Sequence, residues 1–336
     1  MKVKLYITRT IPDSGINKLK NFFEIEIWKE YFPPPKEILK EKVAETDALV
    51  SLLTDPIDSE VLQSASRLRI IAQYAVGVDN IDLNEATKRG IYVTNTPGVL
   101  TDAVADLTWA LILGISRRIV EADKFVRSGE WERKRAGWHP LMLLGTELKG
   151  KVLGIIGFGR IGQAVAKRAK CFGMKIIYYS KTRKDHVERE LGAEFVPLEH
   201  LLETADIVSL HVPLTKETYM LIGEKELKRM KSSAFLINTS RGRVVDEKAL
   251  VKALKEKWIA GAALDVFWQE PIPADHPLLN LENVILAPHI GSATYETRNN
   301  MAEIVADNLI AFLNGKVPPN LVNEEVVNVR KPGFDT

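Results

Sequence analysis

The 336-residue sequence contains a single cysteine, Cys171. One thiol cannot close an intrachain disulfide, so a disulfide-stapled scaffold is excluded and a reducing compartment is the simplest expectation. Because free cysteines are usually buried and unreactive, we expect Cys171 to fill a junction between a helix and the next strand rather than to act as a nucleophile.

The sequence also lacks a strong charge bias and long apolar runs. A formal net charge of +2 gives no reason to expect a nucleic-acid partner or a charged membrane surface. No apolar stretch approaches the roughly 20 residues of a membrane span, and the N-terminus has the pattern of a strand rather than of a secretory leader. We therefore expect a cytoplasmic protein with no nucleic-acid partner, no membrane partner and no metal site.

Short apolar runs alternate with polar segments of helical spacing along the chain. This alternation predicts parallel sheets with helices on both faces. One long helix is expected over residues 101–129, with Thr101 as its N-cap, and another over residues 295–315. The predicted fold class is α/β, with two doubly wound parallel-sheet domains.

The two predicted domains differ in role. Residues 1–99 and 288–336 are expected to form a flavodoxin-like substrate domain, and residues 100–287 a Rossmann dinucleotide-binding domain of six or seven strands. The last helix should return to the first domain, because a lone amphipathic helix needs a surface on which to bury its apolar face.

The stretch "GIIGFGRIG" carries Gly157, Gly159 and Gly162 in G-x-G-x-x-G spacing. It follows an apolar strand and opens a helix, which is the context that a dinucleotide-binding turn requires. Gly157 permits the tight turn, Gly159 lets a pyrophosphate approach the backbone, and Gly162 allows close helix packing. The predicted cofactor contacts are the whole turn: Gly157, Phe158, Gly159, Arg160, Ile161 and Gly162.

An acid is missing at the end of the next strand, where "YYSKTRK" places Ser180. An Asp or Glu there would bind the ribose hydroxyls of NAD and repel a 2′-phosphate. Ser180 and Thr182 can instead donate hydrogen bonds to a phosphate, while Lys181 and Arg183 supply positive charge. We predict that NADP(H) is preferred and that NAD(H) can still bind; the alternative is an ordinary solvated, charged loop.

Three reactive side chains follow later strands, at the edge where doubly wound sheets bind ligands. They are Arg241 in "NTSRGR", Glu270 in "VFWQEP" and His289 in "LAPHIG". Individually they are compatible with a surface ion pair, a turn residue and a structural imidazole. Together they meet the needs of hydride transfer between a ketone and an alcohol.

Each member of this trio would have its own role. Arg241 would bind a substrate carboxylate and polarise the adjacent carbonyl, and His289 would exchange a proton with the alkoxide. Glu270 would hydrogen-bond the other imidazole nitrogen and so fix the tautomer. The nicotinamide would supply the hydride.

An ordered series of motifs, running nearly end to end, resembles the D-2-hydroxyacid dehydrogenase family, and most closely the archaeal members of its glyoxylate/hydroxypyruvate reductase branch. These motifs are "YAVGVDNID", "GIYVTNTPGVLTDAVAD", "GIIGFGRIG", "HVPLTKET", "INTSRGRVVDEKAL", "GAALDVF" and "LAPHIGSAT". The resemblance implies NAD(P)H-dependent reduction of glyoxylate to glycolate and of hydroxypyruvate to D-glycerate, with Arg241, Glu270 and His289 as the catalytic trio.

The resemblance also implies roles for residues that spacing alone does not single out. Backbone amides of Val76 and Gly77 would hold the substrate carboxylate, and Leu53 would form a wall of the substrate pocket. The implied cofactor contacts are Thr101, Val212, Pro213, Thr218, Thr239, Ser240, Arg241, Asp265, His289 and Gly291.

Family members usually pair through their dinucleotide-binding domains, so a homodimer is expected. The segment "WERKRAGWHPLMLLG" resembles an arm that embraces the partner. Its Trp138 would then close the partner's substrate pocket, or simply pack within the interface.

Other functions remain open at this stage. Glu270 argues against formate dehydrogenases, which carry Gln beside the His. A short phosphoglycerate dehydrogenase is a closer alternative, although Leu52 and Leu53 offer no cation for a substrate phosphate. Corepressors that sense dinucleotides share this fold and trio, and they are the alternative from a different functional class.

Overall fold

The computed structural model describes residues 2–135 and 137–334. The chain divides into two compact units: unit 1 comprises Met1–Leu100 and Ser292–Thr336, and unit 2 comprises Thr101–Gly291. Each unit is built on its own parallel sheet. No helix among the described residues has both the length and the apolar character needed to cross a membrane.

Unit 1 has a five-stranded sheet. Its elements are β1 (Val3–Ile7), α1 (Asp13–Leu19), β2 (Phe23–Ile27), α2 (Lys36–Glu45), β3 (Ala48–Ser51), α3 (Ser59–Ser64), β4 (Ile70–Gln73), α4 (Leu83–Lys88), β5 (Tyr92–Thr94), α13 (Tyr295–Leu313) and η3 (Glu324–Asn328). All pairings in the order β2-β1-β3-β4-β5 are parallel. This is the strand order of flavodoxin-like sheets, as predicted.

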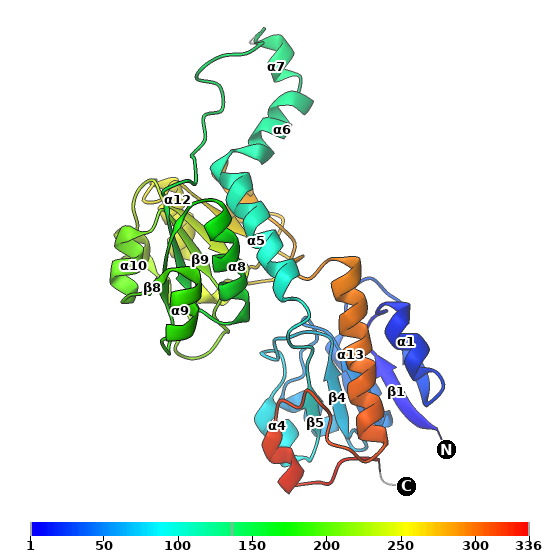
Figure 1. Ribbon diagram of the computed structural model, residues 1–336. Coiled ribbons are helices and arrows are strands. Elements are labelled where there is room, and N and C mark those ends of the chain that lie inside the picture. Colours follow the sequence, from blue (N-terminus) through cyan, green and yellow to red (C-terminus); the bar gives the residue numbers. More distant parts are fainter. Residues whose placement is uncertain (1, 136, 335–336) are drawn as a thin grey trace. The chain divides into compact units, whose positions relative to one another are not determined.

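Successive strand residues of unit 1 point to opposite faces, and each face carries its own core. Leu5 and Ile7 face α1 and α13, whereas Tyr6 faces α2 and α3. The chain therefore returns after unit 2 to complete unit 1, and Figure 1 shows α13 running beside α1. This confirms the expectation that the last long helix buries its apolar face on the first sheet.

Unit 2 has a seven-stranded sheet. Its elements are α5 (Thr101–Ser116), α6 (Ile119–Arg127), α7 (Glu130–Arg133), β6 (Val152–Ile156), α8 (Arg160–Cys171), β7 (Lys175–Tyr179), α9 (Asp185–Leu191), β8 (Ala193–Phe195), α10 (Leu198–Thr204), β9 (Ile207–Leu210), α11 (Glu224–Arg229), β10 (Phe235–Asn238), η1 (Gly242–Val244), α12 (Glu247–Lys255), β11 (Gly261–Leu264), η2 (Pro277–Asn280) and β12 (Val284–Leu286). The parallel order β12-β11-β10-β9-β6-β7-β8 is the Rossmann order, extended by one strand.

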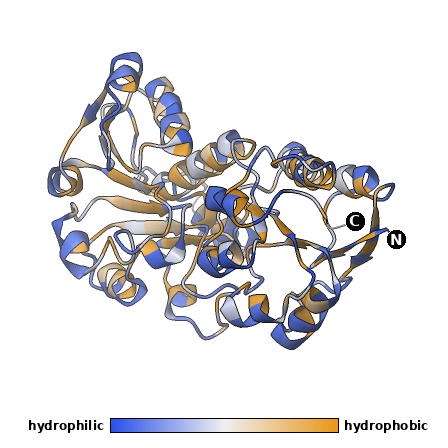
Figure 2. Ribbon diagram, turned by 90° about the horizontal axis from the view of Figure 1, so that it is seen from below, coloured by the Kyte–Doolittle hydropathy of each residue, from blue (hydrophilic) through white to orange (hydrophobic). Residues whose placement is uncertain are grey.

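Both faces of the unit 2 sheet are covered by helices. On β10, Leu236 packs into the core beneath α10, α11 and α12, while the next residue, Ile237, packs beneath α5, α8 and α9. In Figure 2 the strands are largely hydrophobic, and the helices carry hydrophobic and hydrophilic residues on different sides. Burial on both faces explains the continuous apolar runs seen in the sequence.

The prediction of a single helix over residues 101–129 is wrong. The segment forms two helices, α5 and α6, and Thr101 is the first residue of α5 rather than its N-cap. Arg118 adopts a left-handed backbone conformation, with φ 54°, between α5 and α6. The amide of Thr146 donates to the carbonyl of Ser116 (2.8 Å), so the returning chain takes a carbonyl that a continuous helix would use. Apolar periodicity continues across this break, and the sequence therefore does not reveal it.

Cys171 also differs from expectation, because its side chain is exposed. The buried face of α8 consists of Gly162, Val165, Ala166 and Ala169. Cys171 follows Ala169 by two residues, a rotation of about 200° around the helix, and so points away from the sheet. Strand β2, which the sequence analysis did not identify, is an edge strand with only Phe23 buried.

The predicted domain boundaries at 99/100 and 287/288 fall one and four residues before those of the compact units. The second difference places His289 in unit 2. The segment from His289 to Gly291 is bonded to Glu270 and Asp265, which also belong to unit 2. The outermost positions of the predicted first domain, Met1 and residues 335–336, lie outside the described residues.

We predict that Gly15→Ala destabilises the chain. Glycine-to-alanine changes inside helices usually stabilise a protein by up to about 1 kcal/mol. At Gly15, however, an added Cβ would lie 2.5 Å from the carbonyl oxygen of Ala302 in α13. We expect a loss of about 1–3 kcal/mol in the free energy of unfolding, measured by urea denaturation. Asn17→Ala, at an exposed position of α1, is the control and should change stability little.

Candidate active site

The candidate residues of unit 2 follow the carboxyl ends of its strands. Since all seven strands are parallel, the loops after β6, β7, β9, β10, β11 and β12 emerge at one edge of the sheet. Strand β6 pairs with β9 on one side and with β7 on the other, so the direction of winding reverses at β6. A crevice for a ligand is expected at this reversal.

The turn between β6 and α8 has the geometry needed to receive a dinucleotide. Gly157 has φ +96°, and a Cβ there would lie 2.5 Å from the carbonyl oxygen of His211. Gly162 packs directly against the carbonyl of Gly157. A Cβ on Gly159 would meet nothing within 4 Å, and α8 begins at Arg160 without a side-chain cap. An open approach to the uncapped amino end of a 12-residue helix fits a pyrophosphate.

The loop after β7 contains the four residues predicted to bind a 2′-phosphate. The Ser180 hydroxyl donates to the carbonyl of Thr182 (2.6 Å), and Lys181 is exposed. Arg183 pairs with Glu188 (2.8 Å) and Asp185 (2.9 Å). No acid stands at position 180, but two acids of α9 pair with Arg183. The Ser180 hydroxyl donates its proton within the loop, to the carbonyl of Thr182.

The loops after β9 and β10 are held by their own polar side chains. Val212 lies against the Gly157 turn, and the Thr218 hydroxyl donates to the carbonyl of Pro213 (2.6 Å). Asn238, at the end of β10, accepts from the amide and hydroxyl of Ser240 and donates to the carbonyl of Arg241.

Residues of the β10 loop also contact α5 and each other. The hydroxyls of Thr239 and Thr108 lie 3.0 Å apart. Arg241 donates through Nη1 to the carbonyl of Ser240 (2.8 Å). These contacts hold the backbone of Thr239–Arg241 in one conformation.

Glu270 and His289 form the most closely coupled pair of the edge. Nδ1 of His289 lies 2.6 Å from Oε2 of Glu270, and the Phe267 amide donates to Oε1 (3.0 Å). Burial by itself raises the pKa of Glu270. The hydrogen bond and charge of His289, the Phe267 amide and the charge of Arg241 outweigh burial and leave that pKa below its usual value. The trio predicted from sequence is thus brought together within unit 2.

Asp265 holds the backbone that carries His289. Its two carboxylate oxygens accept from the amides of Ile290 and Gly291, each at 2.8 Å. His289 itself has φ 55°, which is uncommon for a residue other than glycine. Burial raises the pKa of Asp265, although both amides and the charge of His289 act in the opposite direction.

Comparison with known proteins agrees with this geometry. Residues 109–291 match the model of the D-isomer specific 2-hydroxyacid dehydrogenase, NAD binding domain. The chain is 66% identical to a glyoxylate reductase of Thermococcus litoralis over 332 residues, which cover 99% of this chain and 100% of the relative. The chain belongs to the D-isomer specific 2-hydroxyacid dehydrogenase family. It is an oxidoreductase of that family, and unit 2 contains its NAD-binding domain.

Two solved structures of similar proteins extend the comparison. The TT0316 protein of Thermus thermophilus has a TM-score of 0.89 and 47% identity, and the match covers 95% of this chain and 100% of that one. An NADPH-dependent glyoxylate/hydroxypyruvate reductase from Sinorhizobium meliloti, in complex with NADP and malonate, has a TM-score of 0.85 and 32% identity. That match covers 100% of this chain and 99% of the other.

The dehydrogenase residues predicted to hold substrate lie at the carboxyl edge of the unit 1 sheet. Leu53 follows β3, and Val76 and Gly77 follow β4. The carbonyl oxygens of Val76 and Gly77 accept from Asn95 (2.8 Å) and Gln73 (3.2 Å). Neither amide N–H of this pair has a hydrogen-bond partner among the described residues, so both can serve an anion.

Sequence analysis missed the polar network beneath these two loops. Gln73 accepts from Ser51 and donates to Asn80 (2.7 Å), and Asn80 donates to the carbonyls of Leu52 (3.0 Å) and Asp55 (2.8 Å). The network thus joins the Leu53 loop to the Gly77 loop. Asn80 stands inside the motif "VGVDNID", but nothing in the spacing of that motif assigns its amide these partners.

Trp138 lies outside the strand-end loops that carry the trio. It belongs to the arm, residues 119–145, which consists of α6, α7 and the segment returning to Gly145, and which projects from the rest of unit 2 in Figure 1. The Trp138 side chain is 81% exposed. Ala136, in the middle of the arm, lies outside the described residues.

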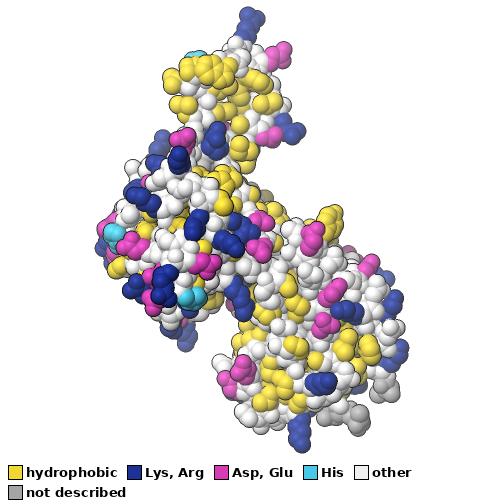
Figure 3. Space-filling view, viewed as in Figure 1, with side chains coloured by type: hydrophobic (Ala, Val, Ile, Leu, Met, Phe, Trp, Pro, Cys, Tyr) yellow, Lys and Arg dark blue, Asp and Glu magenta, His cyan; other side chains and the backbone are white. Residues whose placement is uncertain are grey.

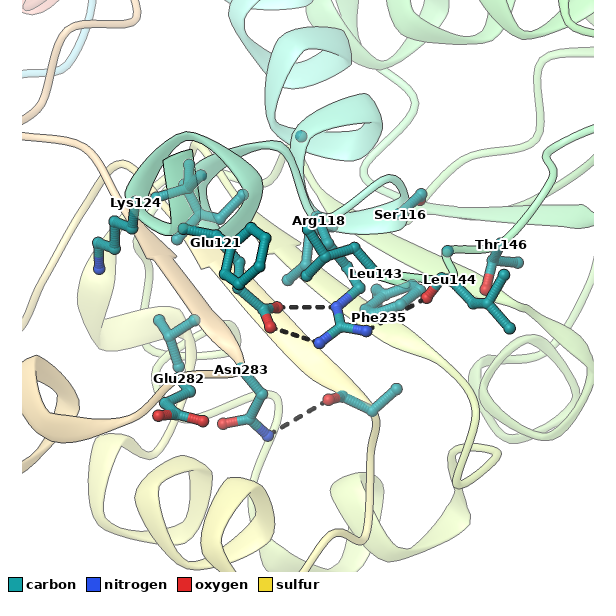
Figure 4. A pocket seen from close by; sticks show the side chains of 18 of the residues that line it. Ser116, Arg118, Glu121, Lys124, Leu143, Leu144, Thr146, Phe235, Glu282 and Asn283 are labelled. Atoms are coloured by element: carbon teal, nitrogen blue, oxygen red, sulfur yellow. Dashed lines mark hydrogen bonds and ion pairs between the residues drawn. The ribbon is translucent and has the colours of Figure 1, made fainter. Parts of the chain in front are cut away.

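A cavity of about 650 Å³ lies at the base of the arm. Figure 4 shows the Arg118–Glu121 ion pair at its wall, together with Leu143 and Leu144. Phe235 and Val284, which begin β10 and β12, also line it, so the cavity is at the amino ends of the strands. It is therefore separate from the catalytic edge. Among the described residues, no group of His, Cys, Asp or Glu side chains could hold a metal ion.

We predict a pH-dependent effect of Glu270→Gln on stability. Because the folded-state pKa of Glu270 is lowered, its carboxylate stabilises the fold above the unfolded-state pKa of about 4.3. This contribution is lost as the pH falls through the lower folded-state pKa. The loss of unfolding free energy in Glu270→Gln should therefore be present above about pH 4.3 and should shrink as the pH falls below that value.

Urea unfolding at about pH 5.5, 4 and 3 would measure this difference, with Glu132→Gln at an exposed position of α7 as the control. A penalty that stayed undiminished at the lowest pH would contradict the assigned Glu270–His289 pairing.

Proposed function

We propose that the protein reduces glyoxylate to glycolate, and hydroxypyruvate to D-glycerate, with a reduced nicotinamide dinucleotide. The observation that carries this proposal is the Glu270–His289 hydrogen bond at the carboxyl edge of an NAD-binding sheet, within the electrostatic reach of Arg241. The glyoxylate reductase names of relatives at 60–66% identity support the choice of substrate within the family.

In the proposed reaction Arg241 binds the substrate carboxylate and polarises the adjacent carbonyl. His289 uses Nδ1 for Glu270, so its Nε2 is the nitrogen that gives a proton to the developing alkoxide. Glu270 stabilises the protonated imidazole and fixes its orientation. The bound nicotinamide supplies the hydride. The backbone amides of Val76 and Gly77 would also bind a substrate carboxylate, with Leu53 as an apolar wall of the substrate pocket.

The cofactor contacts follow from the loops already described. The turn from Gly157 to Gly162 would hold the pyrophosphate, while Val212, Pro213 and Thr218 would line the adenine side. Thr101, Thr239, Ser240, Asp265 and Gly291 would lie toward the nicotinamide. NADP(H) is the preferred cofactor in this proposal and NAD(H) a permitted one, because no acid stands at Ser180 to exclude a 2′-phosphate.

The proposal includes a cytoplasmic homodimer formed through the dinucleotide-binding domains. Helix α6 has no buried residue. Side chains of the arm leave a large apolar surface exposed, visible as the hydrophobic atoms of the upper lobe in Figure 3. These are Ile119, Val120, Val126, Trp131, Trp138, Leu141 and Leu144. Such a surface next to an open cavity suits the arm of a second copy, and Trp138 would then reach toward the partner's substrate pocket.

Purified protein should oxidise NADPH in the presence of glyoxylate and of hydroxypyruvate. His289→Ala should lower kcat by about 10²–10⁴-fold, because the proton donor is lost, while the dissociation constant for NADPH stays within about twofold. Stopped-flow and equilibrium fluorescence measurements would separate the two. His200→Ala, at an exposed position, is the matched control. Absence of turnover with both keto acids and both cofactors would refute the function, and an unimpaired His289→Ala would refute the assigned donor.

Ser180→Asp should reverse the cofactor preference. The new carboxylate would repel the 2′-phosphate and accept from the ribose hydroxyls. We expect NADPH to bind about 10- to 100-fold more weakly, the range for a lost hydrogen bond to a charged group, with NADH binding unchanged or tighter. Titration of both cofactors measures this, and Ser180→Ala separates loss of the hydroxyl from gain of charge. An unaltered NADPH-to-NADH ratio in Ser180→Asp would mean that the loop is an ordinary charged surface.

Charges placed on the arm should dissociate the dimer. For Val126→Glu combined with Leu141→Glu, buried carboxylates would face apolar surface in the interface. Light scattering should show wild-type protein near twice the chain mass of 37.7 kDa, and the double variant near one chain mass. Val317→Glu, an exposed apolar position in unit 1, is the control. A wild-type mass of one chain would contradict the dimer.

A further inference from the structure

A buried phenol lies beneath the loop that follows β7. Tyr178 is fully buried, and its ring stacks on Phe158 of the glycine turn with centroids 3.9 Å apart and planes inclined by 16°. Its hydroxyl donates to Glu188 of α9 (2.6 Å) and accepts from the amide of Lys184 (2.8 Å). One side chain thus joins the pyrophosphate turn, the Ser180–Lys184 loop and α9.

Glu188 also binds Arg183, whose side chain lies at the surface. Nε of Arg183 donates to its Oε1 (2.9 Å) and Nη2 to its Oε2 (2.8 Å). This two-point contact engages one edge of the planar guanidinium. The Glu188 side chain is 12% exposed and that of Arg183 60%. Glu188 is therefore a fixed point beneath a solvent-facing cation.

The pKa values of Tyr178 and Glu188 lie far apart. Burial and the hydrogen bond to Glu188 raise the pKa of Tyr178 to about 12. Hydrogen bonds from Arg183 and Tyr178 lower the pKa of Glu188. Near neutral pH the phenol is therefore always the donor and the carboxylate always the acceptor, so the contact to Arg183 keeps one geometry.

Two opposite effects on a 2′-phosphate can be imagined. The carboxylate of Glu188 could weaken phosphate binding by neutralising Arg183. Alternatively, it could strengthen binding by ordering the Arg183 side chain in advance, because a disordered side chain loses rotamer entropy when a ligand immobilises it. Ordering should prevail here, because the carboxylate is largely shielded from solvent, receives four hydrogen bonds from two side chains and occupies the Nε edge of Arg183.

We propose that the Tyr178–Glu188 pair is an anchor that positions Arg183 for the 2′-phosphate of NADP(H), and so sets the preference for NADPH over NADH. Tyr178 and Glu188 are positioning residues that act through Arg183 and the loop backbone. The inference rests on the NADPH preference proposed above and names residues beyond the loop as its determinants.

Tyr178→Phe tests the anchor directly, since it keeps the stacked ring and removes only the hydroxyl. We expect the dissociation constant of NADPH to rise about three- to tenfold, the factor for one net hydrogen bond, and that of NADH to change less than about twofold. Fluorescence energy transfer from protein to the bound reduced nicotinamide would measure both constants. Competition by adenosine 2′-monophosphate against adenosine 5′-monophosphate would isolate the phosphate subsite, and only the 2′ compound should weaken.

Glu188→Gln decides between ordering and neutralisation. It retains an acceptor oxygen but loses the charge, and we expect weaker NADPH binding, as in Tyr178→Phe. Glu203→Gln is the control for loss of an ion-paired acid, because Glu203 of α10 pairs with Arg229 of α11. Arg183→Ala should lose the preference for NADPH over NADH. Arg183→Lys keeps the positive charge but cannot make the two-point contact with Glu188, and it should lose most of that preference as well.

Three results would overturn the anchor. The first is tighter NADPH binding by Glu188→Gln, and the second is an equal loss of affinity for NADPH and NADH in Tyr178→Phe. The third is an unchanged ratio of the NADPH and NADH dissociation constants in both variants. The wild-type ratio of the two dissociation constants is a separate test: a ratio near one would refute the proposed preference itself.

Discussion

Parallel pairing on both sides of β6 is the constraint on which the architecture of unit 2 depends. Because β6 pairs with β7 and β9 in the same direction, every strand of the sheet ends at one edge. The connections wind in opposite directions from β6, and the Gly157 turn is left against the His211 backbone with open space beside Gly159. The loops of β10, β11 and β12 lie at the same edge, so strand direction brings the proposed cofactor-binding and acid–base residues to one side of the sheet.

Within that edge, two carboxylates hold the groups that we propose to be catalytic. Asp265 accepts two consecutive amides and so holds His289 at φ 55°, an unusual conformation that surrounding structure must maintain. Glu270 binds the imidazole itself. The two acids have pKa shifts in opposite directions. Burial dominates at Asp265 and raises its pKa, whereas at Glu270 the interactions with His289, the Phe267 amide and Arg241 outweigh burial and lower the pKa. One carboxylate shapes the backbone and the other pairs with the imidazole.

Sequence patterns succeeded where the signal was local. Short apolar runs and the turn residues that bound them predict the strands, their common direction and the glycine turn. They also predict that Arg241, Glu270 and His289 follow strands. They failed where a neighbour decided the outcome. The break at Arg118 depends on the Ser116 carbonyl meeting Thr146, and the exposure of Cys171 depends on which side of α8 meets the sheet.

The cofactor loop shows the same division most clearly. The sequence by itself determined that a dinucleotide-binding turn precedes a loop without an acid at Ser180 and with three cations, since these are statements about residue order. Only the tertiary structure decided that Arg183 is paired with Glu188, that Glu188 is held by Tyr178, and that Tyr178 stacks on Phe158. The physical reason is that residue order limits which groups a loop carries, whereas the partners that orient those groups come from other elements and are selected by packing.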